Sequence, residues 1–310
     1  MSPRAIVFGY HDVGVRCLEV LLSGGVEIPL VVTHADDPAE QRWFASVRET
    51  ALAYGLETII PATVDEELQR RIAGLAPDFI FSFYYRSLLP LPVLQAARRG
   101  ALNMHGSMLP AFRGRAPVNW AILSGATHSG ATLHHMVERA DAGDIVDQLA
   151  VPILQNDDAR QVMGKVTVAA EIVLARSLPK LIDGSAVRRP QDLSAGRYFG
   201  RRGPQDGLID WSRSARSIHD LVRAVAPPFP GAFGVIRGER WNIDRTRMIA
   251  QPDFPSGPAM ERSRLQCAAG RCYVHSSSGG VLEILAARCA DAERDLADLA
   301  TRHDGGELVL

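Results

Sequence analysis

Lysine is almost missing from this sequence. Only Lys165 and Lys180 occur among 310 residues, so arginine carries nearly all of the positive charge. The formal net charge is -1 at pH 7. A protein that neutralises many phosphates needs a surplus of positive charge, and the composition provides none. The overall charge therefore does not favour a nucleic-acid partner.

Long apolar runs are lacking as well. No segment approaches the roughly 20 apolar residues that a membrane-spanning helix needs. The N-terminal residues 1–8 run directly into a strand pattern, without an apolar leader or a small-residue cleavage site. We therefore expect no membrane association and a cytoplasmic location.

Cysteine is sparse and scattered. Its four positions are Cys17, Cys267, Cys272 and Cys289. The spacing between Cys267 and Cys272 does not match a zinc knuckle, and no pair of histidines lies near them in the sequence. Because cytoplasmic thiols are normally reduced, we expect free cysteines. We also expect no metal site, and an activity that survives chelation.

The alternation of strand and helix patterns indicates the fold class. Strand patterns alternate with helical ones through the first 180 residues, which is typical of a parallel sheet with helices on both faces. Short strand patterns separated by Gly and Pro then predict a small barrel. The length suits two domains. We predict a Rossmann-like α/β catalytic domain at residues 1–190, a linker at 191–206 and an OB-like β-barrel domain at 207–310.

The expected elements can be placed by residue number. The predicted strands of the first domain are 5–9, 28–33, 57–60, 79–83, 100–104, 131–136 and 145–153. Its predicted helices are 15–22, 41–54, 65–74, 93–97 and 158–181. In the second domain we expect a helix at 214–225 and strands at 232–236, 240–245, 272–276 and 281–285.

Asn103 and His105 stand at the end of the predicted strand 100–104. They are two residues apart, so their side chains point to the same side of an extended strand. Gly106 then permits a tight turn. An Asn amide can donate to a developing oxyanion, and a His can move a proton near neutral pH. The same residues also suit a plain strand end, in which Asn begins a turn.

Asp141 lies in a loop after the predicted strand 131–136. It could orient the imidazole of His105 and raise its pKa by charge proximity, or it could simply form a turn. Arg113 and Arg115 flank a glycine in another predicted loop. They suit either a solvated loop or an anion site.

The stretches 103–107 and 140–143 together resemble the folate-dependent formyltransferase family. In that family the Asn-x-His pair and the later Asp are catalytic, and 10-formyltetrahydrofolate is the formyl donor. The resemblance implies that Asn103, His105 and Asp141 are catalytic. The folate-binding residues that it implies are Ser87, Leu88, Leu89, Arg115, Val137, Glu138, Arg139, Ala140 and Asp141.

Further stretches are similar to one branch of this family, the formyltransferase part of bifunctional polymyxin-resistance proteins. These stretches are 8–12, 33–34, 81–86, 113–117, 199–202 and 223–226. The resemblance covers roughly residues 4–245 and fades across 250–310. It implies formylation of the sugar nucleotide UDP-4-amino-4-deoxy-L-arabinose for lipid A modification. The dehydrogenase activity of the bifunctional relatives is then expected in a separate protein.

Three alternative functions remain. A methionyl-tRNA formyltransferase would carry basic residues in the loop after the second strand, whereas residues 34–40 include Asp36, Asp37 and Glu40. These carboxylates would repel phosphates. A formyltetrahydrofolate hydrolase would use water in place of the amine. A non-catalytic nucleotide-binding module would have no need for the Asn, His and Asp that the resemblance identifies as catalytic.

Overall fold

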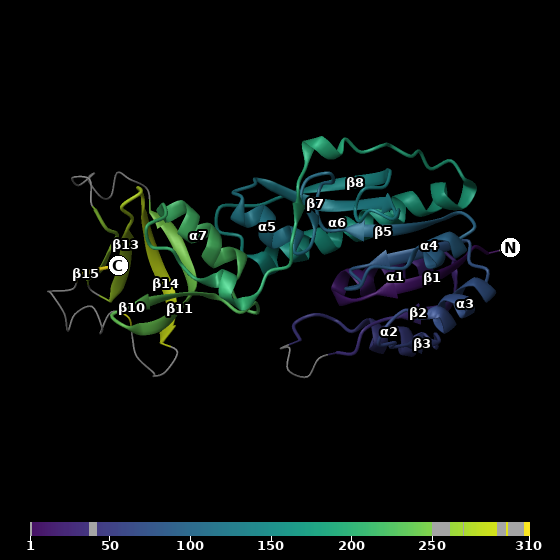
Figure 1. Cartoon of the computed structure of the whole chain (residues 1–310), viewed down its shortest axis with the longest axis horizontal. Coiled ribbons are helices and arrows are strands. Elements are labelled where there is room, and N and C mark those ends of the chain that lie inside the picture. Colours follow the sequence, from purple (N-terminus) through teal and green to yellow (C-terminus); the bar gives the residue numbers. More distant parts are fainter. Residues whose placement is uncertain (1, 37–41, 250–260, 269, 290–295, 297–306) are drawn as a thin grey trace. The chain divides into compact units, whose positions relative to one another are not determined.

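The chain divides into two compact units. A computed structural model describes residues 2–36, 42–249, 261–268, 270–289, 296 and 307–310. The first unit comprises Met1–Pro117, His128–Pro152 and Met163–Gly200. The second comprises Val118–Thr127, Ile153–Val162 and Arg201–Leu310. Each unit is therefore built from three separate stretches of chain (Figure 1).

A seven-stranded sheet forms the centre of the first unit, in the order β3-β2-β1-β4-β5-β7-β8. Its strands are β1 (Arg4–Gly9), β2 (Glu27–Val32), β3 (Thr58–Ile59), β4 (Phe79–Phe83), β5 (Gly100–His105), β7 (His128–His135) and β8 (Ile145–Pro152). The first five are parallel to one another. The predicted Rossmann-like α/β fold is confirmed.

We had expected a parallel sheet, but this sheet is parallel only in part. Strand β7 runs antiparallel to both β5 and β8. Only residues 136–144 connect β7 to β8. A parallel connection needs a crossover of about a dozen residues or more, so this short loop makes a hairpin.

Both faces of the sheet are covered. On one face, Leu68 and Ile72 of α3 (Glu66–Gly74) and Val93 of α4 (Leu91–Ala96) join a buried cluster with the strands. On the other face, the alternate residues Phe79, Phe81 and Phe83 of β4 are buried as well. Burial of both alternating sets is typical of a central parallel strand.

The helix boundaries follow their capping residues. Helix α6 (Ala159–Asp183) begins after Asp158, which forms a reciprocal capping box with Gln161. Helix α2 (Val47–Ala53) is shorter than predicted because Ser46 Oγ accepts from the Glu49 amide and caps its first turn. Helix α1 (His11–Ser23) begins earlier than predicted. Residue 41, where we expected α2 to start, lies outside the described residues.

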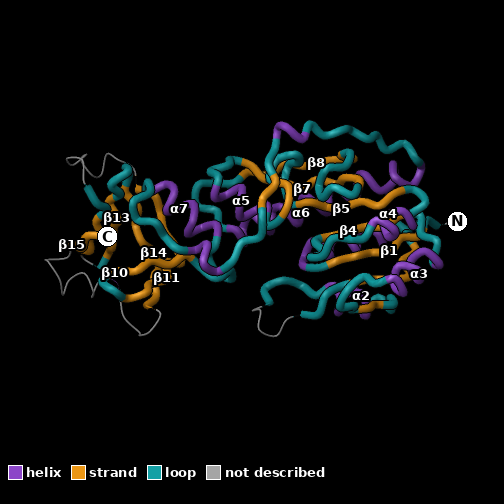
Figure 2. Tube along the Cα trace, in the orientation of Figure 1, coloured by secondary structure: helices purple, strands orange, loops and turns teal. Residues whose placement is uncertain are grey.

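The second unit holds a six-stranded antiparallel sheet, whose strands are coloured orange in Figure 2. The order is β10-β11-β14-β13-β12-β15. The strands are β10 (Ala232–Ile236), β11 (Glu239–Ile249), β12 (Arg264–Ala268), β13 (Arg271–His275), β14 (Val281–Cys289) and β15 (Glu307–Val309). Register shifts between β11 and β14 mark bulges, which bend strands. The sheet forms an antiparallel half-barrel, as the OB-like prediction anticipated.

Helical segments lie outside the sheet in the described part of this unit. Helix α7 (Ala215–Ala224) packs on β11 and β14. Helix α5 (Pro117–Leu123) is bonded to its C-terminal end, because Asn119 Nδ2 donates to the Ala224 carbonyl over 2.7 Å. A polar bond thus joins two parts of the unit that are distant in sequence.

Residues 191–206, the predicted linker, contain short regular elements. They are η1 (Leu193–Ala195), β9 (Tyr198–Phe199) and the start of η2 (Pro204–Gly207). Strand β9 pairs in parallel with β6 (Arg113–Gly114). The pairing fixes the loop that follows β5, which holds part of the candidate site.

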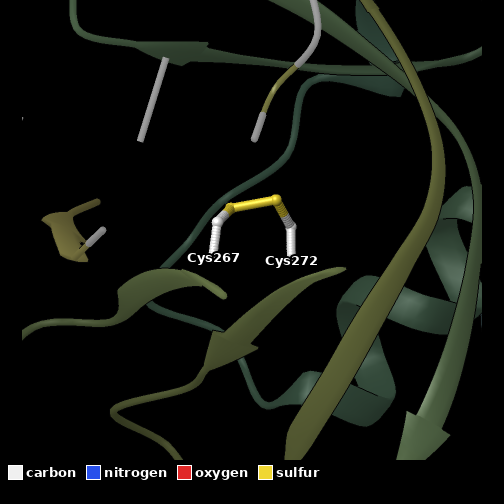
Figure 3. The surroundings of a disulfide bond; sticks show 2 residues. All are labelled: Cys267 and Cys272. Atoms are coloured by element: carbon white, nitrogen blue, oxygen red, sulfur yellow. A yellow bond between two sulfur atoms is a disulfide. The ribbon is translucent and has the colours of Figure 1, made fainter. Parts of the chain in front are cut away.

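Cys267 and Cys272 form a disulfide, so our expectation of free thiols is wrong for this pair (Figure 3). The two residues lie directly opposite each other in the β12–β13 hairpin, with 4.1 Å between their Cα atoms. The spacing of these two cysteines does not match a zinc knuckle, but it suits two residues that face each other across a hairpin. Cys17 and Cys289 are free.

The described part of the chain contains no helix that is both long and apolar enough to cross a membrane.

Candidate active site

The candidate site lies at the carboxyl end of β5. Ala101, Asn103 and His105 alternate along this strand and therefore share one face of the sheet. Ala101 belongs to the buried cluster beneath α3 and α4, so the site residues continue that face. Open α/β sheets bind ligands at this edge. The predicted same-side arrangement of Asn103 and His105 follows from this strand geometry.

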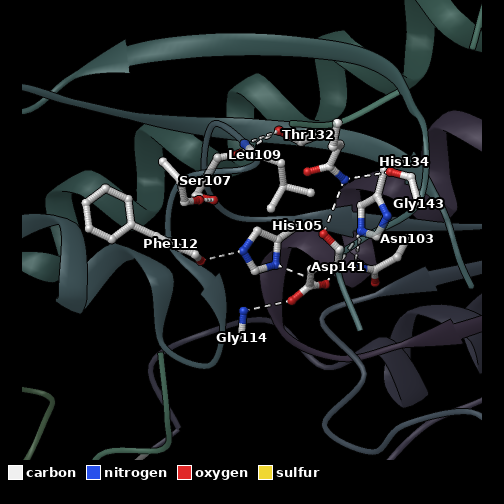
Figure 4. Close-up of polar contacts among 12 residues, drawn as sticks. Asn103, His105, Ser107, Leu109, Phe112, Gly114, Thr132, His134, Asp141 and Gly143 are labelled. Carbon is white, nitrogen blue, oxygen red and sulfur yellow. Dashed lines mark hydrogen bonds and ion pairs between the residues drawn. The ribbon is translucent and has the colours of Figure 1, made fainter. Parts of the chain in front are cut away.

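His105 is held by a backbone carbonyl. Its side chain is 6% exposed, and Nε2 lies 2.9 Å from the Phe112 carbonyl oxygen (Figure 4). A carbonyl can only accept, so Nε2 carries the hydrogen. In the neutral ring Nδ1 is then unprotonated, and it lies 3.6 Å from Asp141 Oδ1. The nitrogen that can take up a proton thus faces the carboxylate.

The loop that supplies this carbonyl is braced by hydrogen bonds. Thr132 Oγ1 donates to the Ser107 carbonyl over 2.6 Å and accepts from the Leu109 amide over 3.1 Å. Ser107 Oγ donates to the Ala111 carbonyl over 2.6 Å. Phe112 itself has a φ of 55°, a strained conformation that persists only where surrounding contacts enforce it. The bracing therefore fixes the orientation of the His105 ring.

Asp141 binds a backbone amide as well as facing histidines. Its Oδ2 accepts from the Gly114 amide over 2.8 Å, and its Oδ1 lies 3.6 Å from both His105 Nδ1 and His134 Nε2. Burial acts to raise the pKa of the Asp141 carboxyl. The positive charge of His105 in its protonated form, the contact with His134 and the Gly114 amide act in the opposite direction and outweigh burial, so the pKa is held well below its usual range. Asp141 is ionised.

Burial lowers the pKa of His105 below its usual value, because desolvation disfavours the charged ring. Asp141 and the Phe112 carbonyl act to raise this pKa, but more weakly. We had expected Asp141 to raise the pKa of His105. Asp141 does act to raise this pKa, but burial lowers it by more, so the net shift is downward. His105 is therefore neutral near pH 7 and able to act as a base.

His134 was not among the predicted site residues, although it completes the cluster. It lies on β7 opposite Asn103 in the strand register, and its Nε2 is 3.1 Å from Asn103 Nδ2. The adjacent histidines at 134 and 135 are visible in the sequence. Their relation to Asn103 depends on a strand pairing that the sequence does not reveal.

Two exposed loops flank this face of the sheet. Ser87 and Leu88 follow β4, and 74% of Leu88 is exposed, while Leu89 packs against the buried cluster beneath α3 and α4. Met136, just after β7, packs against the same cluster. The exposed residues Val137, Glu138 and Arg139 follow it, and then the partly buried Ala140. Both predicted folate-binding loops are thus anchored on one cluster, the one to which Ala101 of β5 belongs.

The two arginines of the 113–115 loop differ. Arg113 is buried and donates to the carbonyls of Leu193 and Gly196, so its guanidinium serves the loop structure. Arg115 has an exposed side chain, and its backbone amide donates to the Phe199 carbonyl. Of the pair, Arg115 is the one whose side chain is available to an anion.

No group of three His, Cys, Asp or Glu side chains that could hold a metal ion is found within the described ranges. The cluster instead supplies an amide donor, a neutral imidazole and an ionised carboxylate. Together these groups can stabilise an oxyanion and move a proton.

Solved structures share this architecture. An N-formyltransferase from Helicobacter canadensis, in complex with folinic acid and dTDP-3-aminofucose, is 19% identical, with a TM-score of 0.70 over 92% of this chain and 99% of that chain. WlaRD, a sugar 3N-formyl transferase in the presence of dTDP and 5-N-formyl-THF, is 18% identical, with a TM-score of 0.71 over 94% and 99%. A 4-N formyltransferase from Francisella tularensis is 18% identical, with a TM-score of 0.62 over 77% and 95%. At these identities the likeness shows the fold.

Two family models match the sequence itself. Residues 4–178 match the formyl transferase model, and residues 202–294 match the model of the formyl transferase C-terminal domain. The first match alone covers more than half of the chain, and it includes Asn103, His105 and Asp141. The chain therefore belongs to the formyl transferase family of enzymes.

Proposed function

We propose that this enzyme transfers a formyl group from 10-formyltetrahydrofolate to the amine of a sugar nucleotide, UDP-4-amino-4-deoxy-L-arabinose. The observation that carries the proposal is the cluster of Asn103, His105 and Asp141 at the carboxyl edge of β5. Membership of the formyl transferase family supports the reaction type.

Each residue of the cluster has a distinct role in this reaction. The sugar amine attacks the formyl carbon, and the carbonyl oxygen becomes an oxyanion, which an N–H of Asn103 stabilises. His105 accepts the proton that the amine loses, at Nδ1. The same proton then passes to N10 of the folate as the bond between N10 and the formyl carbon breaks. Asp141 stabilises the imidazolium that exists between these two steps.

The folate would lie across the two exposed loops. Leu88 and Val137 are apolar and exposed, at 74% and 46%, and such side chains can pack on a flat pteridine ring. Ser87, Leu89 and residues 138–141 would complete this binding surface, and Arg115 would contact the anionic part of the cofactor. Two similar structures were obtained with folinic acid or 5-N-formyl-THF, which supports a folate donor.

A small acceptor is favoured over tRNA by the solved structures. Two of them, similar over almost their whole length, contain dTDP-3-aminofucose or dTDP. The acidic loop gives weaker support than we expected, because Asp36 forms an ion pair with Arg42 over 3.1 Å. Asp37 and Glu40 lie outside the described residues. The choice of UDP and of a 4-amino pentose rests on the family branch that the sequence resembles.

An acceptor assay tests the proposal. The enzyme is incubated with 10-formyltetrahydrofolate, and tetrahydrofolate release is followed with UDP-4-amino-4-deoxy-L-arabinose, a dTDP-3-amino sugar, aminoacylated initiator tRNA, or water alone. We expect rapid release with the UDP sugar and none with tRNA. Efficient formylation of tRNA at physiological salt, with the sugar nucleotides inert, would favour a methionyl-tRNA formyltransferase. Release without any amine would favour a hydrolase.

The pH dependence should reflect the lowered pKa of His105. Neutral His105 is the active form, and activity falls only as the pH drops through that lowered pKa. An ordinary histidine has a pKa of about 6.5. We therefore expect kcat at saturating substrates to stay level from about pH 8 down to about pH 6.5 and to fall at more acidic pH. An acid limb centred above pH 7 would contradict the assignment of His105 as a buried neutral base.

A further inference from the structure

His134 is a buried histidine that the reaction steps above do not use. Its side chain is 2% exposed, and it lies on β7 directly opposite Asn103 of β5. Figure 4 shows its ring beside Asn103 and Asp141, and Nε2 faces both side chains. The hydrogen bonds of this ring indicate which of its nitrogens carries a hydrogen and how it contacts Asn103, the proposed oxyanion donor.

The backbone fixes the tautomer of His134. Its Nδ1 lies 2.9 Å from the carbonyl oxygen of His135. That carbonyl can only accept, so Nδ1 carries the hydrogen. A ring that carries its single hydrogen on Nδ1 has Nε2 as an acceptor. The two histidines of the site therefore hold opposite tautomers, because His105 carries its hydrogen on Nε2.

The tautomer of His134 dictates the orientation of the Asn103 amide. Nε2 of His134 lies 3.1 Å from Asn103 Nδ2, within hydrogen-bond distance, whereas Asp141 Oδ1 is 3.6 Å away. An unprotonated Nε2 accepts an N–H from the amide. The flipped amide would place its oxygen against the ring lone pair, and two acceptors repel. The bond to His134 uses one of the two Nδ2 hydrogens and leaves the other for a ligand.

We propose that His134 is a positioning residue: its Nδ1–H tautomer holds the Asn103 amide with an N–H directed to the oxyanion. This rests on the proposed function, in which Asn103 is the oxyanion donor. Without His134 the amide can flip, and part of the enzyme population presents an oxygen where a donor is needed. The defect concerns the transition state, so it should lower kcat and leave KM largely unchanged.

Three substitutions separate positioning from packing. His134→Leu removes the acceptor and should lower kcat by roughly tenfold or more, within the loss expected for an oxyanion donor. His134→Gln keeps an acceptor oxygen that can bind the amide, and it should recover much of kcat. His135→Gln is the matched control, because it changes the next buried histidine of β7, whose ring lies against Gly100. It should retain wild-type kcat.

A double substitution tests the coupling. Adding His134→Leu to Asn103→Ala should cost nothing further, because the group that His134 positions is already absent. An independent, additional loss in the double variant would contradict the proposal. So would a His134→Leu variant with the kcat of the His135→Gln control.

The ring state can be measured without any turnover. In ¹⁵N NMR spectra of the wild-type protein, with His134→Gln used for assignment, we expect His134 to show a protonated Nδ1 and an unprotonated Nε2. A protonated Nε2 would overturn the proposal even if formyl transfer were established. Failure of the wild-type enzyme to formylate any amine would instead overturn the proposed function, and the spectrum would still decide whether His134 orients the amide.

Discussion

Asn103→Ala and His105→Ala variants are expected to lose at least about a hundredfold of formyl transfer while remaining folded. The first removes the only side-chain amide of the described site cluster, and the second removes its base. Neither side chain is a large part of the core. Steady-state kinetics with the sugar nucleotide, beside circular dichroism and thermal unfolding, would measure both effects.

An exposed histidine of β7 provides the control for these variants. His128 lies at the start of the strand, six residues before His134, and a His128→Ala variant should keep wild-type turnover. Near wild-type activity in either Asn103→Ala or His105→Ala would show that the assigned role is wrong. Loss of the folded state in either variant would show that the side chain contributes mainly to structure.

Arg223→Ala should cause a large loss of stability in the second unit. Arg223 and Asp220 form a buried ion pair with 2.8 Å between Nη2 and Oδ1, and both side chains are 5% exposed. Arg223 also donates to the Asp157 carbonyl over 3.0 Å. Removing Arg223 takes the buried partner from the Asp220 carboxylate and leaves it to the half-exposed Arg216, so the free energy of unfolding should fall by up to about 3–5 kcal/mol.

Arg216 is the matched control for this effect. It contacts the same carboxylate, with Nε 3.1 Å from Asp220 Oδ2, but 48% of its side chain is exposed. Exposed pairs contribute about 0–1 kcal/mol, so Arg216→Ala should be nearly neutral. Denaturant unfolding of both variants, with the C-terminal unit monitored by its buried Trp241, distinguishes them. Equal losses in the two variants would contradict a specific role for burial.

Hydrophobic patterns in the sequence located some strands at their observed bounds, whereas the longer strands β11 and β14 extend beyond the predicted residues. The predicted strands 79–83 and 232–236 coincide with β4 and β10, because short apolar runs of this length between turn residues favour strands. The two-residue pairing of β6 with β9 was missed, since no periodicity can appear in so short an element. The antiparallel direction of β7 and β8 follows from the short loop between them, and the hydrophobic pattern of the strands does not reveal it.

The site was predictable in part. The positions of Asn103 and His105 on one face follow from strand alternation alone. The contacts of Asp141 depend on how residues 136–144 fold back toward β5, and spacing does not specify that path. His134 and the carbonyl of Phe112 became visible only through the β5–β7 pairing and the loop after β5. The disulfide likewise required the register of a hairpin.

The stretches that form the two units alternate along the chain, and this limits how chimeras with related proteins can be built. A fragment that ends within residues 191–206 would retain Val118–Thr127 and Ile153–Val162 but lose the rest of the unit to which they belong. Asn119 would then lack the Ala224 carbonyl that accepts its Nδ2 hydrogen bond. Chimeras that exchange the C-terminal portion at a single crossover would mismatch these stretches. An exchange of the whole second unit would have to transfer all three segments together.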